Sequence, residues 1–219
     1  MKNWWYYHKW YVISGIILFF ISFNLLSNAF GWFKKTPDFQ IAYIGEFPLP
    51  DDTVKALEKA FSSLADDYNH DGQIIVHVNQ YTTGSLNDNN ADNLEYRQAS
   101  ELQLIADIDH CESYFFLMET PEIIQDTYQI LALPDGNCPA PSDFSVTDKT
   151  IVWSDIDVFQ NLNLGSYKTT LLGNETSGEN SELLAPLYLG RRCFYTSPKP
   201  ENADDCAILW NKLFTPGTN

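Results

Sequence analysis

Residues 67–72 (DYNHDG) form the segment whose residue types and spacing come closest to a chemical site. Oxygen-bearing side chains at alternate positions, followed by a glycine, match the first half of an EF-hand-type calcium loop. In such a turn the alternate side chains converge, and the glycine permits the bend. The candidate calcium ligands are therefore Asp67, Asn69, Asp71 and, through its main-chain carbonyl, Gln73.

The second half of a calcium loop is missing from the sequence. Val78 stands at the twelfth position in place of glutamate, and a strand-like segment follows where a helix would be needed. An ion bound here would need another carboxylate, such as Asp66, and would be structural rather than catalytic. The alternative interpretation is a polar turn between a helix and a strand, because Asn, Asp and Gly favour turns.

Cysteine is the second residue type with specific chemistry, and the chain has four: Cys111, Cys138, Cys193 and Cys206. They form no C-x-x-C pair, so a zinc knuckle is not indicated. Four cysteines allow three pairings. We expect a disulfide between Cys193 and Cys206, which closes a short loop, and its complement between Cys111 and Cys138. The alternative is that all four are unpaired, buried thiols.

Recognisable catalytic signatures are not found in the sequence. It contains no G-x-S-x-G elbow, H-E-x-x-H pair, P-loop or G-x-G-x-x-G turn. His110 could serve as a base for Cys111, but adjacent residues on a strand point to opposite faces. Asp155 and Asp157 form a D-x-D pattern that is too short to indicate a function. We therefore expect no catalytic residues and no enzymatic activity.

Strand-like and helix-like segments alternate from residue 39 onward and would position these residues. The strand-like segments are 40–44, 74–78, 114–118, 130–133 and 150–153. Helices are expected to begin at Asp51 or Asp52, near Leu94 and at Thr120-Pro121, and a last one covers 204–213. Residues 82–93 and 171–180 are expected to be loops. Because parallel neighbours need crossover helices, the alternation predicts an α/β fold with a mostly parallel, doubly wound, Rossmann-like sheet.

Two of the expected helices have an apolar face that can be read from the spacing of their residues. In the first, the face is formed by Val54, Leu57, Phe61, Leu64 and Tyr68. In the second, it is formed by Leu94, Leu102, Ile105 and Ile108.

The stretch from Trp10 to Phe33 contains no charged residue and has aromatic residues at both ends. About 20 helical residues rise about 30 Å, the thickness of the hydrocarbon layer, and aromatic belts mark membrane interfaces. We predict a cytoplasmic, aromatic and basic N-terminus (1–10), a transmembrane helix (11–33), a linker (34–38) and an extracytoplasmic α/β domain (39–219). The alternative is a cleaved signal peptide with a small-x-small site at 27–29. Either outcome exports the same domain.

Charge is distributed unevenly along the chain. All 29 acidic residues and only nine of the 13 basic ones follow Thr36, which gives that part a formal net charge of −20. Such a domain repels phosphate backbones and anionic lipid surfaces, so nucleic acid is not an expected partner. Arg191 and Arg192 stand out in this acidic context. We expect them to pair with nearby carboxylates; the alternative is that they contact an anion.

Several of these segments together resemble a group of uncharacterised single-pass exported proteins of Gram-positive bacteria. They are residues 4–10 (WWYYHKW), the uncharged stretch, 41–45 (IAYIG), the loop 67–72 ahead of 74–76, the helix through 102–108 and the strand 114–118. The exported part is also similar to the first lobe of extracellular solute-binding proteins, in which a βαβ lobe faces a ligand cleft. The resemblance covers roughly residues 1–135, includes no catalytic motif and implies ligand binding. The chain has no lipobox cysteine, and 39–219 is short for a two-lobed binding protein.

The sequence leads us to expect a single-pass cell-membrane protein whose C-terminal domain is an extracytoplasmic binding or accessory module. Ligands of open α/β sheets bind beyond the carboxyl ends of the strands, which places a site near 45–48, 80–83 and 119–121. The expected partners are the membrane and a transporter or cell-surface protein, and Ca²⁺ is the candidate cofactor. The alternatives are a structural protein that assembles with partners at the cell surface through a calcium-stabilised loop, and a hydrolase with an unrecognised site.

Overall fold

The computed structural model describes residues 2–29, 35–83, 91–171, 174–195 and 199–214. The chain divides into two compact units, Met1–Thr36 and Pro37–Asn219. The boundary falls inside the expected linker 34–38, and each unit is described by itself below.

In the N-terminal unit, the described residues include one helix, α1 (Lys2–Ala29). Residues 2–10, expected to be a separate segment before the membrane, belong to this same helix. Residues 30–33, the end of the predicted span, lie outside the described residues. Within the described part of the chain, no helix combines the length and the apolar character needed to cross a bilayer.

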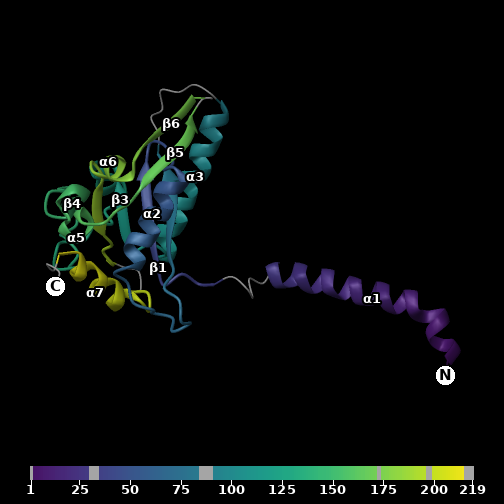
Figure 1. Ribbon diagram of the computed structural model, residues 1–219. Coiled ribbons are helices and arrows are strands. Elements are labelled where there is room, and N and C mark those ends of the chain that lie inside the picture. The colour runs from purple at the N-terminus through teal and green to yellow at the C-terminus, as the bar shows by residue number, and fades with distance from the viewer. Residues whose placement is uncertain (1, 30–34, 84–90, 172–173, 196–198, 215–219) are drawn as a thin grey trace. The chain divides into compact units, whose positions relative to one another are not determined.

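The second unit is built on a five-stranded sheet with the strand order β2-β1-β3-β7-β4. The strands are β1 (Phe39–Gly45), β2 (Val76–Thr82), β3 (Phe115–Met118), β4 (Thr150–Val152) and β7 (Tyr188–Arg191). β1 pairs in parallel with both β2 and β3, whereas β7 runs antiparallel to its neighbours β3 and β4. The expected α/β fold with a mostly parallel sheet is confirmed (Figure 1).

Helices cover both faces of this sheet because the strand side chains alternate between two hydrophobic clusters. Phe39, Ile41 and Tyr43 of β1 face the cluster that includes side chains of α2 (Asp51–Ser62) and α7 (Ala203–Phe214). Ala42 and Ile44 face the cluster that includes side chains of α3 (Ala91–His110) and α4 (Pro121–Tyr128). The central strands are buried on both sides, which explains their nearly continuous apolar sequence.

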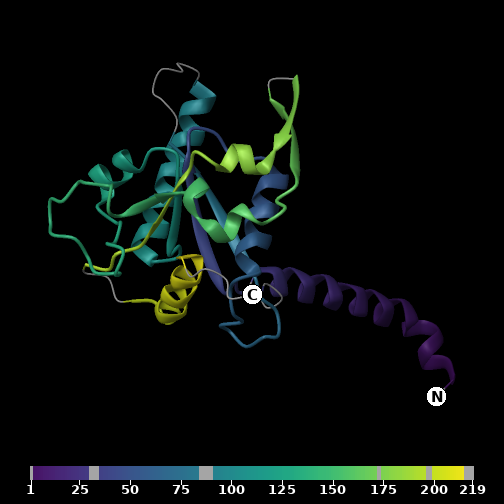
Figure 2. The same cartoon turned by 60° about the vertical axis from the view of Figure 1, so that its left-hand side comes forward.

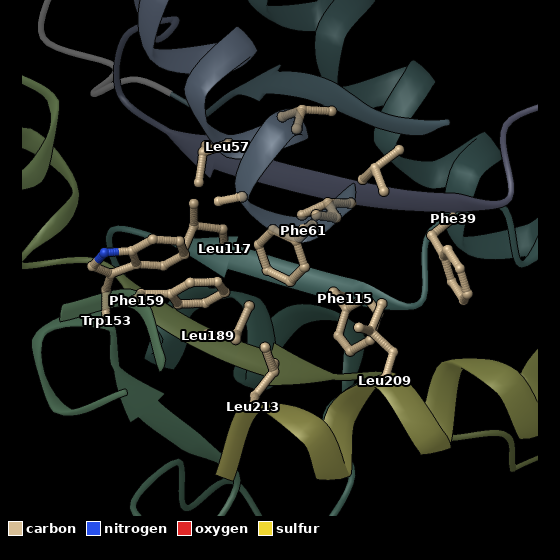
Figure 3. Packing of buried hydrophobic residues seen from close by; sticks show 14 of the residues in the cluster. Phe39, Leu57, Phe61, Phe115, Leu117, Trp153, Phe159, Leu189, Leu209 and Leu213 are labelled. Atoms are coloured by element: carbon tan, nitrogen blue, oxygen red, sulfur yellow. The ribbon is translucent and has the colours of Figure 1, made fainter. Parts of the chain in front are cut away.

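Aromatic rings fill the larger cluster (Figure 3). Phe61 of α2 lies 5.9 Å from Phe115 of β3 and 5.1 Å from Phe159, measured between ring centroids. Trp153 stacks on Phe159 at 4.1 Å. Trp153 is the first residue of the 3-10 helix Trp153–Asp155, and Phe159 belongs to α5 (Asp157–Gln160). These two short helices, which follow β4, therefore contribute aromatic side chains to the core.

Two expectations about strands and loops are wrong. Residues 130–133 form only an isolated bridge between Leu131 and Arg192. Part of the expected loop 171–180 is β6 (Asn174–Glu179), which pairs antiparallel with β5 (Ser166–Leu171) and leads into α6 (Asn180–Leu184). This β5–β6 hairpin lies beside α2 in both views (Figures 1 and 2). Its pairs are mostly polar, such as Thr169 with Thr176, so it lacks the apolar alternation that indicates a strand.

The apolar face expected on α3 is wrong for three of its four residues. Leu94, Leu102 and Ile105 are exposed, Ile108 is half-buried against the smaller cluster, and Ser100, Leu104 and Asp107 are buried. Polar contacts as well as apolar ones determine which face of α3 packs against the sheet. The Ser100 hydroxyl accepts a hydrogen bond from the Thr82 amide at 2.7 Å, and Asp107 accepts one from the Tyr81 hydroxyl at 2.7 Å.

Candidate binding cleft

A cleft of about 940 Å³ lies beyond the carboxyl ends of β1 and β2, and we call it the β1–β2 cleft. One wall is the segment from Phe47 to Asp51, which connects β1 to α2, together with Gln80 of β2. The other wall is the β5–β6 hairpin, through residues 168–170 and 175–177. The first wall falls in the region where the sequence predicts a ligand site, but the hairpin was not foreseen.

Glu119, which follows β3, fixes the start of this first wall. The Tyr43 hydroxyl donates to Glu119 Oε1 at 2.7 Å and lies 3.1 Å from the Phe47 carbonyl oxygen. The Glu46 amide donates to Glu119 Oε2 at 2.8 Å. Burial, and secondarily the hydrogen bond to Glu119, raises the pKa of Tyr43 far above its ordinary value, so the hydroxyl stays protonated as a donor. Glu119 therefore supports the wall and does not line the cleft.

Gln80 fixes the other end of the wall. Its Oε1 atom accepts a hydrogen bond from the Leu49 amide at 2.7 Å. The helix α2 follows at once, with Pro50 at its N-cap position and Asp51 and Asp52 in its first turn. Asp51 is thus the first residue of the helix and not its cap. The wall is held at both ends by side chains from neighbouring strands, which pre-forms the cleft.

Gly45→Ala is expected to lower the free energy of unfolding by about 1–3 kcal/mol, the usual cost of overpacking. A Cβ atom at this position would lie 2.2 Å from the Tyr43 hydroxyl oxygen and 2.7 Å from Glu119 Oε1. Because Tyr43 is buried, its ring has no room to retreat. Urea denaturation measures the loss. The added Cβ would also lie 2.6 Å from the Tyr43 ring carbon that carries the hydroxyl. Tyr43→Phe removes the shortest of these contacts and keeps that carbon, so Gly45→Ala added to it should cost less than in the unmodified chain; equal costs in both backgrounds would contradict the steric explanation.

The charged side chains of the cleft are all exposed. They are Asp51, Lys168 and Glu175, two acids and one base. The main-chain amide of Lys168 donates to Asp52 Oδ2 at 3.4 Å, which connects the hairpin to the first turn of α2. The remaining lining is uncharged, with hydroxyl groups from Thr169, Thr170, Thr176 and Ser177 and apolar surface from the 47–50 segment.

In the candidate calcium loop, the side-chain oxygens bond to main-chain amides. Asp67 Oδ2 accepts from the Gly72 amide at 2.8 Å, Asn69 Oδ1 from the Asp71 amide at 2.9 Å, and Asp71 Oδ1 from the Gln73 amide at 2.9 Å. These are the contacts of a polar turn. Among the described residues, no group of three or more His, Cys, Asp or Glu side chains is placed to hold a metal ion. Calcium binding by Asp67, Asn69, Asp71 and Gln73 stays a prediction.

The buried carboxylate of Asp38 anchors this loop from outside it. Asp38 Oδ1 accepts from the Asn69 amide at 3.0 Å, and Oδ2 accepts from the Ile75 amide at 2.8 Å. Its carbonyl oxygen accepts from the Asn202 side chain at 3.0 Å. Spacing within the loop could not reveal this residue, because Asp38 lies about thirty positions upstream, in the expected linker 34–38.

The expected disulfide pairing is wrong, because Cys138 is bonded to Cys193, with 5.2 Å between their Cα atoms. The Leu131–Arg192 bridge explains the pairing: the Cys193 amide donates to the Ile130 carbonyl at 2.8 Å, and a turn at residues 133–137 brings the chain back over Cys193. Cys206 is buried on α7 and Cys111 follows α3, and both are free thiols. Neither of the two expected bonds, Cys193–Cys206 and Cys111–Cys138, is therefore present.

The expectation that Arg191 and Arg192 pair with carboxylates is also wrong. Among the described residues, neither arginine forms an ion pair with a carboxylate. Both arginines are buried and donate to main-chain carbonyls. Arg191 donates to the Leu133 and Pro134 carbonyls and lies over the Trp210 ring at 5.2 Å. Arg192 donates to the Ile108 and Ser113 carbonyls, and burial lowers the pKa of its guanidinium. These side chains tie loops to the sheet.

The other residues singled out in the sequence lie apart from the β1–β2 cleft. His110 ends α3, and Cys111 follows it with a left-handed backbone (φ 56°), so the two residues are not on a strand as assumed. Asp155 and Asp157 are exposed on the short helices after β4. None of the four lines the cleft.

Comparison of the chain with protein-family models, with curated proteins and with solved structures found no match in any of the three. We therefore infer a function from the geometry of the cleft.

Proposed function

We propose that the chain is a non-enzymatic, membrane-anchored extracytoplasmic binding module, similar to one lobe of a solute-binding protein, whose ligand occupies the β1–β2 cleft. The observation that carries the proposal is the position and size of this cleft. It lies beyond the carboxyl ends of parallel strands, where open α/β sheets bind ligands, and its volume of about 940 Å³ is within the range of ligand pockets.

The rigid support of the first wall favours binding over mere surface irregularity. Glu119 and Gln80 hold the two ends of the segment 46–49 through hydrogen bonds of 2.7–2.8 Å. A pre-formed wall avoids the entropy cost of ordering a loop when the ligand binds. Among the described residues, the hairpin wall is connected to α2 by the hydrogen bond from the Lys168 amide to Asp52.

Anchoring in the membrane is proposed from the sequence and from α1. The uncharged stretch from Trp10 to Phe33 is flanked by aromatic residues, and α1 exposes large apolar side chains such as Phe19 and Phe20. A helix that exposes apolar side chains all round is typical of a lipid environment. The disulfide between Cys138 and Cys193 favours an oxidising compartment for the second unit.

The experiment is a thermal-shift screen of the full chain in detergent against a panel of sugars, amino acids, short peptides and nucleosides. A ligand of the cleft should raise Tm in a concentration-dependent manner, and Ser177→Trp, which fills the cleft from β6, should abolish the shift. Ser166→Trp is the matched control, because Ser166 is exposed on the same hairpin outside the lining. A shift that survives Ser177→Trp, or no shift with any compound, overturns the proposal.

A second candidate, assembly with a partner protein at the cell surface, is favoured by the exposed Leu94, Leu102 and Ile105 of α3. The same preparation separates the two candidates. A Tm shift that is lost in Ser177→Trp supports the binding module, whereas silence across the panel, together with a protein that co-purifies in fixed proportion, supports assembly. The anchor itself is refuted if the intact chain stays in aqueous solution without detergent.

A further inference from the structure

We propose that the ligand of the β1–β2 cleft is a neutral oligosaccharide, which stacks a sugar ring on Phe47 and hydrogen-bonds to the hydroxyl-rich hairpin wall. This inference rests on the proposed function and adds the class of ligand.

Phe47 supplies an aromatic platform at the cleft. Its side chain is 56% exposed although it stands in a segment whose main chain is held by Tyr43 and Glu119. A large aromatic ring kept exposed on a fixed backbone, at the edge of a concave surface, is suited to a ligand that has an apolar face. The C–H face of a pyranose ring is such a surface.

The opposite wall supplies uncharged hydrogen-bonding groups. Four hydroxyl residues of the hairpin belong to the lining, and because successive strand side chains point to opposite faces, Thr169 and its partner Thr176 share one face while Thr170 and Ser177 lie on the other. Either pair offers hydroxyls that can both donate and accept, as sugar hydroxyls do. The amide of Gln80 adds a directed donor: because its Oε1 atom accepts from the Leu49 amide, its –NH₂ group is left to point elsewhere. An aromatic face on one side and small hydroxyls on the other match an amphipathic, polyhydroxylated ligand.

The charges around the cleft disfavour an anionic ligand. The first turn of α2, where a helix would attract an anion, already carries Asp51 and Asp52. Among the described residues of the lining, Lys168 is the one base, against Asp51 and Glu175.

Recognition of a cation or a zwitterion is also disfavoured, because the charged groups of the lining are exposed. Exposed ion pairs contribute little to binding, since water and salt screen them. Size points in the same direction: the volume of about 940 Å³ approaches the upper end of ligand pockets, which is more than one amino acid or monosaccharide needs. The cleft thus fits several neutral sugar units.

The test is calorimetric titration of the full chain, in a detergent without a sugar headgroup, with cellohexaose, maltohexaose and the hexamer of N-acetylglucosamine. At least one is expected to bind, and Phe47→Ala should weaken that binding about tenfold, which corresponds to about 1.4 kcal/mol. Phe144→Ala is the matched control, because Phe144 is 45% exposed and lies outside the lining. It should bind as the unmodified chain does.

Four results would overturn the inference. They are the absence of binding by all three hexamers, an equal affinity in Phe47→Ala, an equal loss in Phe144→Ala, and binding of a galacturonic acid hexamer as strong as that of the neutral ones. If amino acids or peptides bind instead and Ser177→Trp abolishes their binding, the ligand class proposed here is wrong while the binding module stands. The two proposals therefore fail separately.

Discussion

Asp107→Ala is expected to lower the free energy of unfolding by about 3–5 kcal/mol, because it leaves several buried donors without an acceptor. Asp107 is 1% exposed. Its Oδ1 atom accepts from the Ser113 amide at 2.9 Å, and its Oδ2 atom accepts from the hydroxyls of Ser113 and Tyr81 at 2.6 and 2.7 Å. Each buried donor that loses its partner costs about 1–3 kcal/mol. The loss would be a large fraction of the stability of an ordinary domain.

Denaturation in urea, followed by the fluorescence of the core tryptophans, measures this loss. Asp109→Ala is the matched control: Asp109 is exposed two positions further along α3, and its replacement should change stability by about 0.5 kcal/mol or less. Asp107→Asn keeps an acceptor oxygen and should fall between the two. If Asp107→Ala is no less stable than Asp109→Ala, the hydrogen-bond network does not hold α3 to the end of β2.

The same network shows why the sequence predicts the central strands better than the orientation of α3. Residues 41–44 and 115–118 are apolar on both faces, so their burial follows from composition alone. On α3, apolar spacing favours a face with Leu102 and Ile105, and that face is exposed. Its buried face carries Asp107, whose partners Tyr81 and Ser113 lie on other segments of the chain. Periodicity measures hydrophobicity, and it contains no information on a hydrogen bond whose partner is distant in sequence.

The sequence likewise predicts one wall of the candidate cleft and not the other. Topology predicts its first wall, because the segments after β1 and β2 must lie at the carboxyl edge of a parallel sheet. The second wall, the β5–β6 hairpin, is polar on both faces and gives neither a period of 2 nor one of 3.6. The sequence places Glu119 in the segment expected near the ligand site, but it does not predict that Glu119 supports the wall. Its partners, the Tyr43 hydroxyl and the Glu46 amide, come close to it only because β3 pairs with β1.

Disulfide connectivity was the least predictable feature, because loop length alone favoured the neighbours Cys193 and Cys206. The bridge between Leu131 and Arg192 instead places Cys138 beside Cys193, 55 positions apart in the sequence. The closed loop is long, so the bond restricts the unfolded chain strongly. In the chain-entropy account, loops of this size stabilise the folded state by about 4 kcal/mol.

Cys138→Ser is therefore expected to lower the free energy of unfolding by about 4 kcal/mol, measured by urea denaturation without reductant. Cys111→Ser is the matched control: its free, partly exposed thiol has no bond to lose, and the change should be within about 1 kcal/mol.

Burial raises the pKa of the Cys206 thiol to about 12, so an alkylating reagent at pH 8 should modify Cys111 in the folded protein and Cys206 only after unfolding. Peptide mapping of the oxidised protein that joins Cys193 to Cys206 would contradict the pairing, and with it the path by which residues 133–138 return over β7.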